Sequence, residues 1–146
     1  MDEQRAWRAY LESSKVLFDA LDRQLQREAE MPHAYFEVLV RLSEAEDRSL
    51  RMSELADLTL SSRSRLSHAV ARLEERGWVV RVNCETDRRG QIATLTDAGF
   101  AVLAGAAPNH VETVREYVID GLSEEQLQQL AVIGETIINR VEARRA

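Results

Sequence analysis

The 146-residue chain has little cysteine and no long apolar run. Its one cysteine, Cys84, excludes an internal disulfide, which agrees with a reducing compartment. No stretch approaches the roughly 18 consecutive apolar residues of a membrane span. The N-terminal residues lack the apolar core of a signal peptide. We therefore expect a cytoplasmic protein without a membrane partner.

Motifs of catalysis and of metal binding are also missing. The chain has no nucleophile elbow, no glycine-rich phosphate loop and no paired-carboxylate motif. Its three histidines, His33, His68 and His110, lie far apart and do not have the spacing of zinc ligands. We therefore expect no enzyme activity, no metal and no cofactor.

The positive charge of this acidic chain is concentrated in one stretch. The net charge of −6 opposes non-specific binding to a polyanion. Between residues 61 and 90, however, seven arginines stand against four acidic residues. This local balance of +3 leaves −9 for the rest of the chain. A length of 146 residues with 45% apolar composition suits a single compact domain, residues 1–146. The basic stretch is then its candidate nucleic-acid-binding part.

The first third of the chain predicts two helices. Apolar residues recur every three or four positions from Trp7 to about Ala29, as in a long amphipathic helix. A helix of about 20 residues spans about 30 Å, more than a small DNA-binding module needs, so part of its stripe is expected to face another chain. Pro32 opens a second helix, because proline suits a first helical turn. Its nearly continuous apolar band predicts burial on most sides.

Two short helices joined by a tight connection follow. The polar run SEAEDRS ends the second helix, and Leu50 and Met52 form a short extended segment. Ser53 is expected to cap a third helix, SELADLTL. Residues 59–62 then connect it to the next helix without a glycine. This order is typical of a helix-turn-helix with an exposed second helix.

That exposed helix is predicted over residues 62–76. It has a hydroxyl residue at its start, a single apolar stripe, and Gly77 just past its end. Its other side carries side chains that donate to phosphates or to base edges in a major groove. They are Arg63, Ser64, Arg65, Ser67, His68 and Arg72. The alternatives are an ordinary solvated surface and, for His68, packing against the following hairpin.

A β-hairpin and two further helices complete the prediction. WVVRVN and QIATL are rich in β-branched residues and flank the loop CETDRRG, which is either a wing on DNA or a solvated hairpin tip. Thr96 can cap the next helix, which is expected to kink or break near Ala107 because it contains Pro108. Ser123 and Gln126 form a capping box for the last helix.

The first helix, the last helix and the helix around Pro108 hold more apolar surface than a three-helix DNA module covers. The simplest partner is a second copy, since two-fold dimers are the commonest oligomers. Such a dimer presents two recognition helices about one DNA turn apart. The expected interface residues are Trp7, Leu11, Val118, Leu127, Leu130, Ile133, Ile137 and Val141.

From Trp7 to Val141 the chain resembles the MarR family of winged helix-turn-helix regulators. The resemblance rests on RMSELADLTLSSRSRLSHAVARLEERGWVVR, on TDRRG with its Asp-x-Arg wing, and on LTDAG. It implies a mainly α fold with a small β-hairpin wing. Residues of about 33–95 would form the winged helix-turn-helix, and residues of about 5–30 and 96–144 the dimerisation helices. It further implies a homodimeric transcriptional regulator, usually a repressor, bound to double-stranded DNA at a palindromic operator.

The resemblance also assigns roles to individual residues. Arg65 and Arg72 would lie near phosphates, and Arg89 or Arg88 would enter the minor groove while Asp87 holds the wing by an ion pair. The residues that would face bases are Ser62, Arg63, Ser64, Ser67 and His68.

Family members often leave DNA when a small aromatic or phenolic compound binds, or when a cysteine is oxidised. The candidate effector residues here are Tyr10, Phe18, Tyr35 and Phe36, with plain core packing as the alternative. A redox response would have to use Cys84, although peroxide sensors of the family usually carry their cysteine near the first helix. A helical protein–protein interaction module is the alternative from another functional class.

Overall fold

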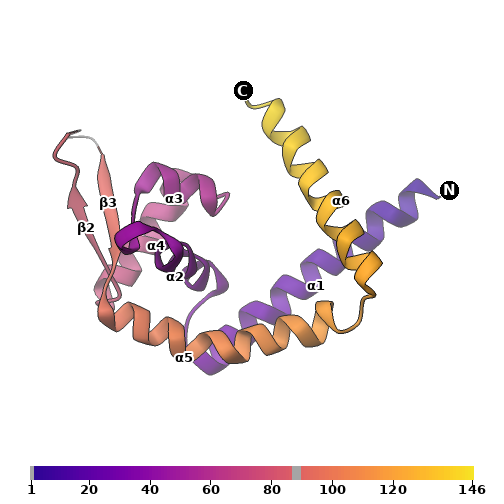
Figure 1. The fold of residues 1–146 in the computed structure, drawn as a ribbon, viewed down its shortest axis with the longest axis horizontal. Coiled ribbons are helices and arrows are strands. Elements are labelled where there is room, and N and C mark those ends of the chain that lie inside the picture. Colours follow the sequence, from indigo (N-terminus) through magenta and orange to yellow (C-terminus); the bar gives the residue numbers. More distant parts are fainter. Residues whose placement is uncertain (1, 87–89) are drawn as a thin grey trace. The chain divides into compact units, whose positions relative to one another are not determined.

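The computed structural model describes residues 2–86 and 90–146, which form two compact units, residues 1–110 and 111–146. The first unit contains α1 to α4, the strands and most of α5; the second contains the end of α5, a π-helical segment and α6 (Figure 1). In chain order the elements are α1 (Glu3–Ala29), α2 (His33–Glu44), a 3₁₀ segment (Glu46–Arg48), β1 (Ser49–Arg51), α3 (Met52–Leu58), α4 (Arg63–Glu75), β2 (Val79–Asn83), β3 (Gln91–Leu95), α5 (Asp97–Val114), the π-helical segment (Arg115–Ile119) and α6 (Glu124–Ala143). The predicted mainly helical fold with a small hairpin is confirmed. None of the described helices is long and apolar enough to cross a membrane.

The long helix α1 begins earlier than its apolar periodicity predicts. Asp2 caps it, since its carboxylate accepts a hydrogen bond from the backbone N–H of Arg5 at 3.1 Å. The helix ends at Glu30, which adopts a left-handed conformation with φ of 53°. Only residues of its C-terminal third, including Leu21 and Leu25, are buried.

Helix α2 lies at the centre of the core of the first unit. Val38, Leu39 and Leu42 are buried on it, which confirms the prediction from its apolar band. The buried cluster draws residues from every helix and from two strands of the unit. It comprises Leu25, Met31, Phe36, Val38, Leu39, Leu42, Leu55, Ala56, Leu66, Val70, Leu73, Val79, Ala93, Leu95 and Leu103.

The predicted hairpin is the larger part of a three-stranded antiparallel sheet of order β1-β3-β2. The third strand, β1, pairs with β3 so that Ser49 faces Thr94, and their hydroxyl oxygens lie 2.7 Å apart. The extended segment expected around Leu50 is this strand. Met52, however, is already helical, so the prediction that Ser53 caps α3 is wrong. The cap position is Arg51, whose backbone N–H donates to the Glu54 carboxylate at 3.4 Å.

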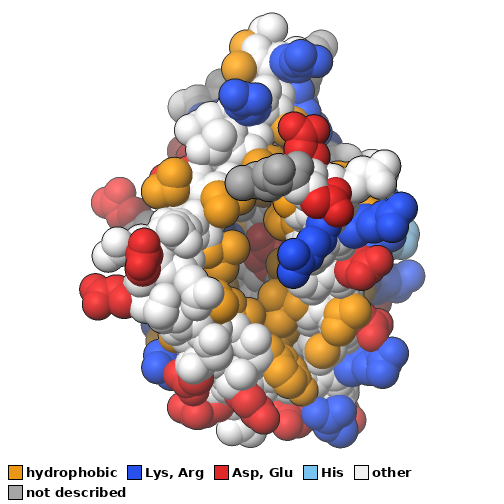
Figure 2. Space-filling view, turned by 90° about the vertical axis from the view of Figure 1, so that its right-hand side faces the viewer, with side chains coloured by type: hydrophobic (Ala, Val, Ile, Leu, Met, Phe, Trp, Pro, Cys, Tyr) orange, Lys and Arg blue, Asp and Glu red, His pale blue; other side chains and the backbone are white. Residues whose placement is uncertain are grey.

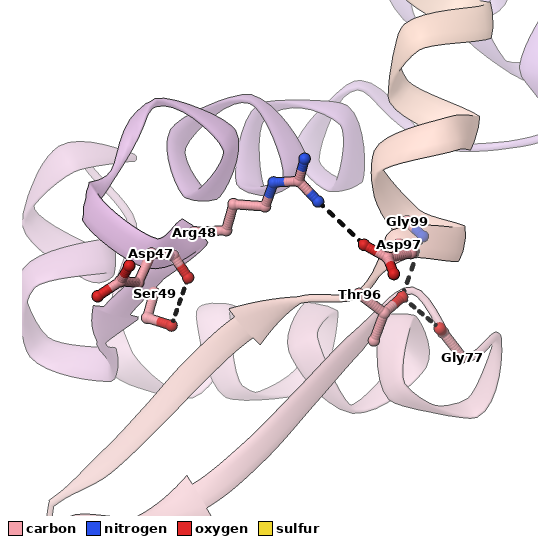
Figure 3. Close-up of polar contacts among 7 residues, drawn as sticks. All are labelled: Asp47, Arg48, Ser49, Gly77, Thr96, Asp97 and Gly99. Carbon is pink, nitrogen blue, oxygen red and sulfur yellow. Dashed lines mark hydrogen bonds and ion pairs between the residues drawn. The ribbon is translucent and has the colours of Figure 1, made fainter.

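The start of α5 is fixed to the turn that follows α4 (Figure 3). As predicted, Thr96 caps α5: its Oγ1 accepts from the backbone N–H of Gly99 at 3.0 Å. The same hydroxyl donates to the carbonyl of Gly77 at 2.7 Å. Arg48 pairs with Asp97 at 3.2 Å, which ties the 3₁₀ segment to the same helix end.

The break expected near Ala107 is absent, because α5 remains helical through Pro108 as far as Val114. Proline removes one backbone N–H donor from the helix and leaves the carbonyl four residues earlier, that of Ala104, without it. Both Ala104 and Pro108 are exposed, so water can hydrogen-bond that carbonyl.

Two glycines of α5 give a matched test of the packing at its start. A Cβ at Gly99 would lie 2.2 Å from the carbonyl oxygen of Trp78, whereas a Cβ at Gly105 would have no heavy atom within 4 Å. We predict that Gly99→Ala lowers the free energy of unfolding by about 1–3 kcal/mol. Gly105→Ala should raise it by about 0.5–1 kcal/mol, because alanine is the better helix former. Urea titration monitored by circular dichroism measures both; equal effects would contradict the close packing.

Candidate nucleic-acid interface

Helices α3 and α4 form the predicted helix-turn-helix. The turn contains no glycine, and Leu60 takes the left-handed conformation that glycine usually supplies, with φ of 52°. The turn is closed by the backbone N–H of Ser61, which donates to the Ala56 carbonyl at 3.0 Å. The Thr59 hydroxyl donates to the Leu55 carbonyl at 2.8 Å. These hydrogen bonds satisfy polar groups at the end of α3 and set the direction in which α4 leaves.

The orientation of α4 follows from one buried stripe. Leu66, Val70 and Leu73 are buried in the core. Ser62 caps the helix, since its Oγ accepts from the backbone N–H of Arg65 at 3.2 Å. The residues of α4 and of its cap that are predicted to meet DNA are all exposed. They are Ser62, Arg63, Ser64, Arg65, Ser67, His68 and Arg72.

Besides Ser62, the side chains of Arg72 and Ser67 also have partners within the protein. Arg72 donates to both carboxylate oxygens of Glu75, at 3.0 and 3.1 Å, in a solvent-exposed ion pair. Ser67 accepts a hydrogen bond from Arg81 of β2 at 3.1 Å. Exposed ion pairs contribute little to stability, so Arg72 can exchange Glu75 for a phosphate at small cost.

An open hollow of about 430 Å³ lies where α3, α4 and the base of the hairpin meet. Arg51 and Arg63 are its charged lining residues, and Ser53, Ser67 and Gln91 add polar groups. Among the described residues, two guanidinium groups and no carboxylate line the hollow, which favours an anion such as a DNA phosphate.

The hairpin loop is closed at its base, where the backbone N–H of Cys84 donates to the Gly90 carbonyl at 2.8 Å. Arg51 reaches the same place, with its Nη2 3.5 Å from the Cys84 sulfur and 3.4 Å from the Thr86 hydroxyl. The predicted wing residues Asp87, Arg88 and Arg89 lie outside the described residues.

The thiol that the redox hypothesis requires is buried. Cys84 is 8% exposed, and its sulfur lies 3.2 Å from the hydroxyl of Thr86. Oxidation of a cysteine depends on access to its sulfur as well as on thiolate character. The burial of Cys84 therefore disfavours a role as a peroxide sensor.

The four aromatic residues proposed for an effector do not gather in one place. Tyr10 lies beside Trp7, with ring centroids 6.3 Å apart. The guanidinium carbon of Arg76 lies over the ring of Tyr35, 5.5 Å from the centroid of that ring. Arg76 also stacks on Trp78 at 4.9 Å and donates to the Glu30 carbonyl at 2.9 Å, so it connects the end of α4 to the end of α1.

Phe18 and Phe36 belong to a separate cluster with two histidines. The ring of Phe18 lies edge-on to His33 at 5.6 Å, and Phe36 lies 4.5 Å from His110. The two imidazole centroids are 5.9 Å apart. The sequence does not predict that these two histidines meet, because His33 and His110 are separated by 77 positions. Among the described residues, no three His, Cys, Asp or Glu side chains are grouped to hold a metal ion.

His110 is buried and hydrogen-bonded to a buried glutamine. Its Nδ1 lies 2.9 Å from Oε1 of the buried Gln24, and Nε2 of Gln24 donates to Glu28 at 2.7 Å. Because the Gln24 nitrogen faces Glu28, its oxygen accepts, and Nδ1 of His110 carries the hydrogen. Burial lowers the pKa of His110 below its ordinary value, and the nearby His33 lowers it further.

This lowered pKa predicts a pH dependence of stability. Between the folded pKa of His110 and the ordinary value of 6.5 the unfolded chain binds more protons than the folded chain. The contribution of His110 to the free energy of unfolding is therefore complete above pH 6.5, and it is lost as the pH falls through the pKa of His110 in the folded chain. We expect His110→Gln to flatten the decline of the unfolding free energy between pH 7 and 5. The exposed control His68→Gln should keep the parent's slope; an unchanged slope in His110→Gln would refute the assignment.

The residues predicted for a dimer interface are apolar and open to solvent or half-buried. Trp7 is 59% exposed and Ile133 is 52% exposed. No residue of α6 is buried, although its predicted capping box between Ser123 and Gln126 is formed at 2.9 and 3.1 Å. Hydrophobic side chains lie open at the molecular surface in the space-filling view (Figure 2). The remaining predicted interface residues, Leu11, Val118, Leu127, Leu130, Ile137 and Val141, are also half-buried or exposed.

Comparison with known proteins finds similar transcriptional regulators. A family model described as MarR family matches residues 30–90. The HTH-type transcriptional regulator PecS of Dickeya dadantii is 33% identical over 82 residues, which cover 56% of this chain and 49% of PecS. The transcriptional repressor MprA of Escherichia coli K12 is 29% identical over 107 residues, covering 73% and 60% of the two chains. The chain thus spans about half to three fifths of the length of these curated relatives.

Two solved structures from Streptomyces coelicolor match over nearly the whole chain. Sco3205, a MarR family transcriptional regulator solved in complex with DNA, has 52% sequence identity and a TM-score of 0.92 and covers 94% of this chain and 86% of its own. AbsC, another MarR family transcriptional regulator, has 41% identity and a TM-score of 0.92, with coverage of 98% and 97%.

Proposed function

Because the chain belongs to the MarR family of transcriptional regulators, we propose that it is a sequence-specific DNA-binding repressor that acts as a homodimer on a palindromic operator. The observation that carries this proposal is the exposed arginine, serine and histidine face of α4 on a helix-turn-helix, in a chain that is otherwise acidic. Support comes from the similar Sco3205, which was solved in complex with DNA, and from MprA, which is a repressor.

In this proposal α4 enters the major groove. Arg65 and Arg72 bind phosphates, and Arg88 or Arg89 of the wing enters the minor groove while Asp87 holds the wing. The side chains that face base edges are Ser62, Arg63, Ser64, Ser67 and His68. Ser62 then has two roles, since its Oγ also caps α4.

The proposal can be tested at Arg63, which is exposed and lines the positive hollow. A duplex selected by the wild-type protein from a randomised library serves as the probe. Arg63→Ala should weaken its binding by about 1–3 kcal/mol, while Arg27→Ala, on the exposed surface of α1, should not. Fluorescence anisotropy at fixed salt measures both affinities. Equal affinity of Arg63→Ala and its parent would remove Arg63 from the interface.

The salt dependence of the same binding separates DNA reading from the alternative, a protein–protein interaction module. For a DNA-binding protein, the logarithm of the binding constant falls with the logarithm of the salt concentration, with a slope near −0.9 for each phosphate contact. Wild-type affinity that does not change with salt, or no binding to any duplex, would favour the interaction module.

The homodimer is proposed to form through the apolar faces of the terminal helices. Ile133 and Ile137 are exposed on α6, and their replacement together by glutamate would place charge in that interface. We expect this double variant to sediment as a monomer and to lose high-affinity operator binding, since each copy would then hold one half-site alone. The control replaces two exposed apolar residues of β2, Val80 and Val82, by glutamate outside the terminal helices, and should remain dimeric. A dimeric Ile133/Ile137 variant would place the interface elsewhere.

Release from the operator is proposed to follow the binding of a small aromatic or phenolic effector. Of the candidate residues, Phe18 and Phe36 are the pair that the two histidines bring together. An aromatic ring would stack on this cluster. Phe36 packs against His110 of α5 and belongs to the same buried core as α4. Binding of an effector at this cluster would therefore act on the buried side of the recognition helix.

A further inference from the structure

Arg81 stands out because it crosses from the sheet to the exposed side of α4. It lies in the middle of β2, and its side chain is only 18% exposed. Its Nε donates to Oε1 of Glu74 at 2.6 Å, and its Nη1 donates to Oγ of Ser67 at 3.1 Å. Glu74 and Ser67 are seven residues apart, about two turns or 10 Å along the helix. One guanidinium therefore fixes two points of α4 to the strand that leads into the wing.

The ion pair of Arg81 with Glu74 differs in its burial from the Arg72–Glu75 ion pair of α4. The Glu74 side chain is 32% exposed, whereas the partners in the Arg72–Glu75 pair are 51% and 64% exposed. A charge-assisted hydrogen bond of 2.6 Å in a partly buried place is screened less by water and salt than an exposed one. Arg81 is thus placed as a lasting connection, and Arg72 as one that can be exchanged.

The bond from Arg81 determines what Ser67 can offer to a ligand. A serine hydroxyl has one hydrogen to donate and two lone pairs to accept. Arg81 occupies a lone pair of Ser67 and places positive charge beside it, so a second donor is disfavoured there. The hydroxyl hydrogen remains available. Ser67 is exposed and lines the hollow that Arg63 also lines, so this hydrogen can reach a ligand on the outer side of α4.

We infer that Arg81 is a positioning residue for DNA reading, which holds α4 through Glu74 and presents Ser67 as a hydrogen-bond donor. This inference rests on the proposed function, because it requires the exposed side of α4 to face DNA. Ser67 then favours acceptors in the major groove, such as N7 or O6 of guanine, N7 of adenine or O4 of thymine. It disfavours the exocyclic amino groups of adenine and cytosine, which donate.

A double-mutant cycle tests the connection between Arg81 and Ser67. The probe is the duplex that the wild-type protein selects from a randomised library, with affinity measured by fluorescence anisotropy at fixed salt. Arg81→Met and Ser67→Ala should each lower affinity about tenfold, the effect of one lost hydrogen bond to DNA. The double variant should lose little more than either single variant. Ser64, exposed on the same helix, provides the control: the effects of Ser64→Ala and Arg81→Met should multiply.

Arg81→Lys separates positioning from stability. A lysine ammonium can keep the pair with Glu74, but it lacks the planar fork that bonds Glu74 and Ser67 together. We expect this variant to unfold at nearly the wild-type temperature and yet to bind the duplex about as weakly as Arg81→Met. In repeated selections, Arg81→Lys and Ser67→Ala should lose base preference at the same position of each half-site.

Three results would overturn the inference. If the effects of Arg81→Met and Ser67→Ala multiply, Arg81 does not act through Ser67. If Arg81→Lys recovers both stability and DNA affinity, the ion pair with Glu74 explains the whole role of Arg81. If the wild-type protein selects no duplex, the proposed function fails as well, and this result is seen with the parent protein before any variant is compared.

Discussion

The structure depends on the burial of one side of α4 against α2. Leu66, Val70 and Leu73 are fully or almost fully removed from solvent, and each such side chain contributes about 1.5–3 kcal/mol when buried. The stripe is narrow, so its burial also decides which residues remain outside. The exposed arginine, serine and histidine side chains are those that cannot enter this core without losing their hydration. Core packing and the composition of the candidate interface are therefore two results of one constraint.

Three arginines connect the helix-turn-helix of α3 and α4 to the elements around it. Arg76 ties the C-terminal end of α4 to the carbonyl of Glu30 at the end of α1. Arg81 ties the side of α4 to β2, and Arg51 ties the start of α3 to the base of the hairpin loop. These contacts join α3, α4 and the hairpin to the end of the long helix.

Much of the helix-turn-helix and the hairpin could be predicted from the sequence. The features that could not be predicted depend on contacts between distant parts of the chain. The period of Leu66, Val70 and Leu73 predicts both the helix and its exposed side, because a buried stripe needs only local spacing. The sequence predicts an extended segment around Leu50, but a strand of three residues carries no pattern that could predict its pairing with β3. The roles of Arg51 and Arg81 could not be predicted, because they depend on which face of each strand meets which helix. The sequence does indicate that Arg81 shares a strand face with Val79, two residues before it. The cluster of Phe18, Phe36 and the two histidines arises from contacts distant in sequence.

In the proposed complex, two copies of the α4 face read the major groove. Methylation interference at guanine N7, which lies in the major groove, tests it most directly on the duplex that the wild-type protein selects. Methylation should block binding in two clusters whose centres are about one helical turn, or 10 base pairs, apart. Undiminished binding to duplexes methylated at every guanine of the protected region would contradict it.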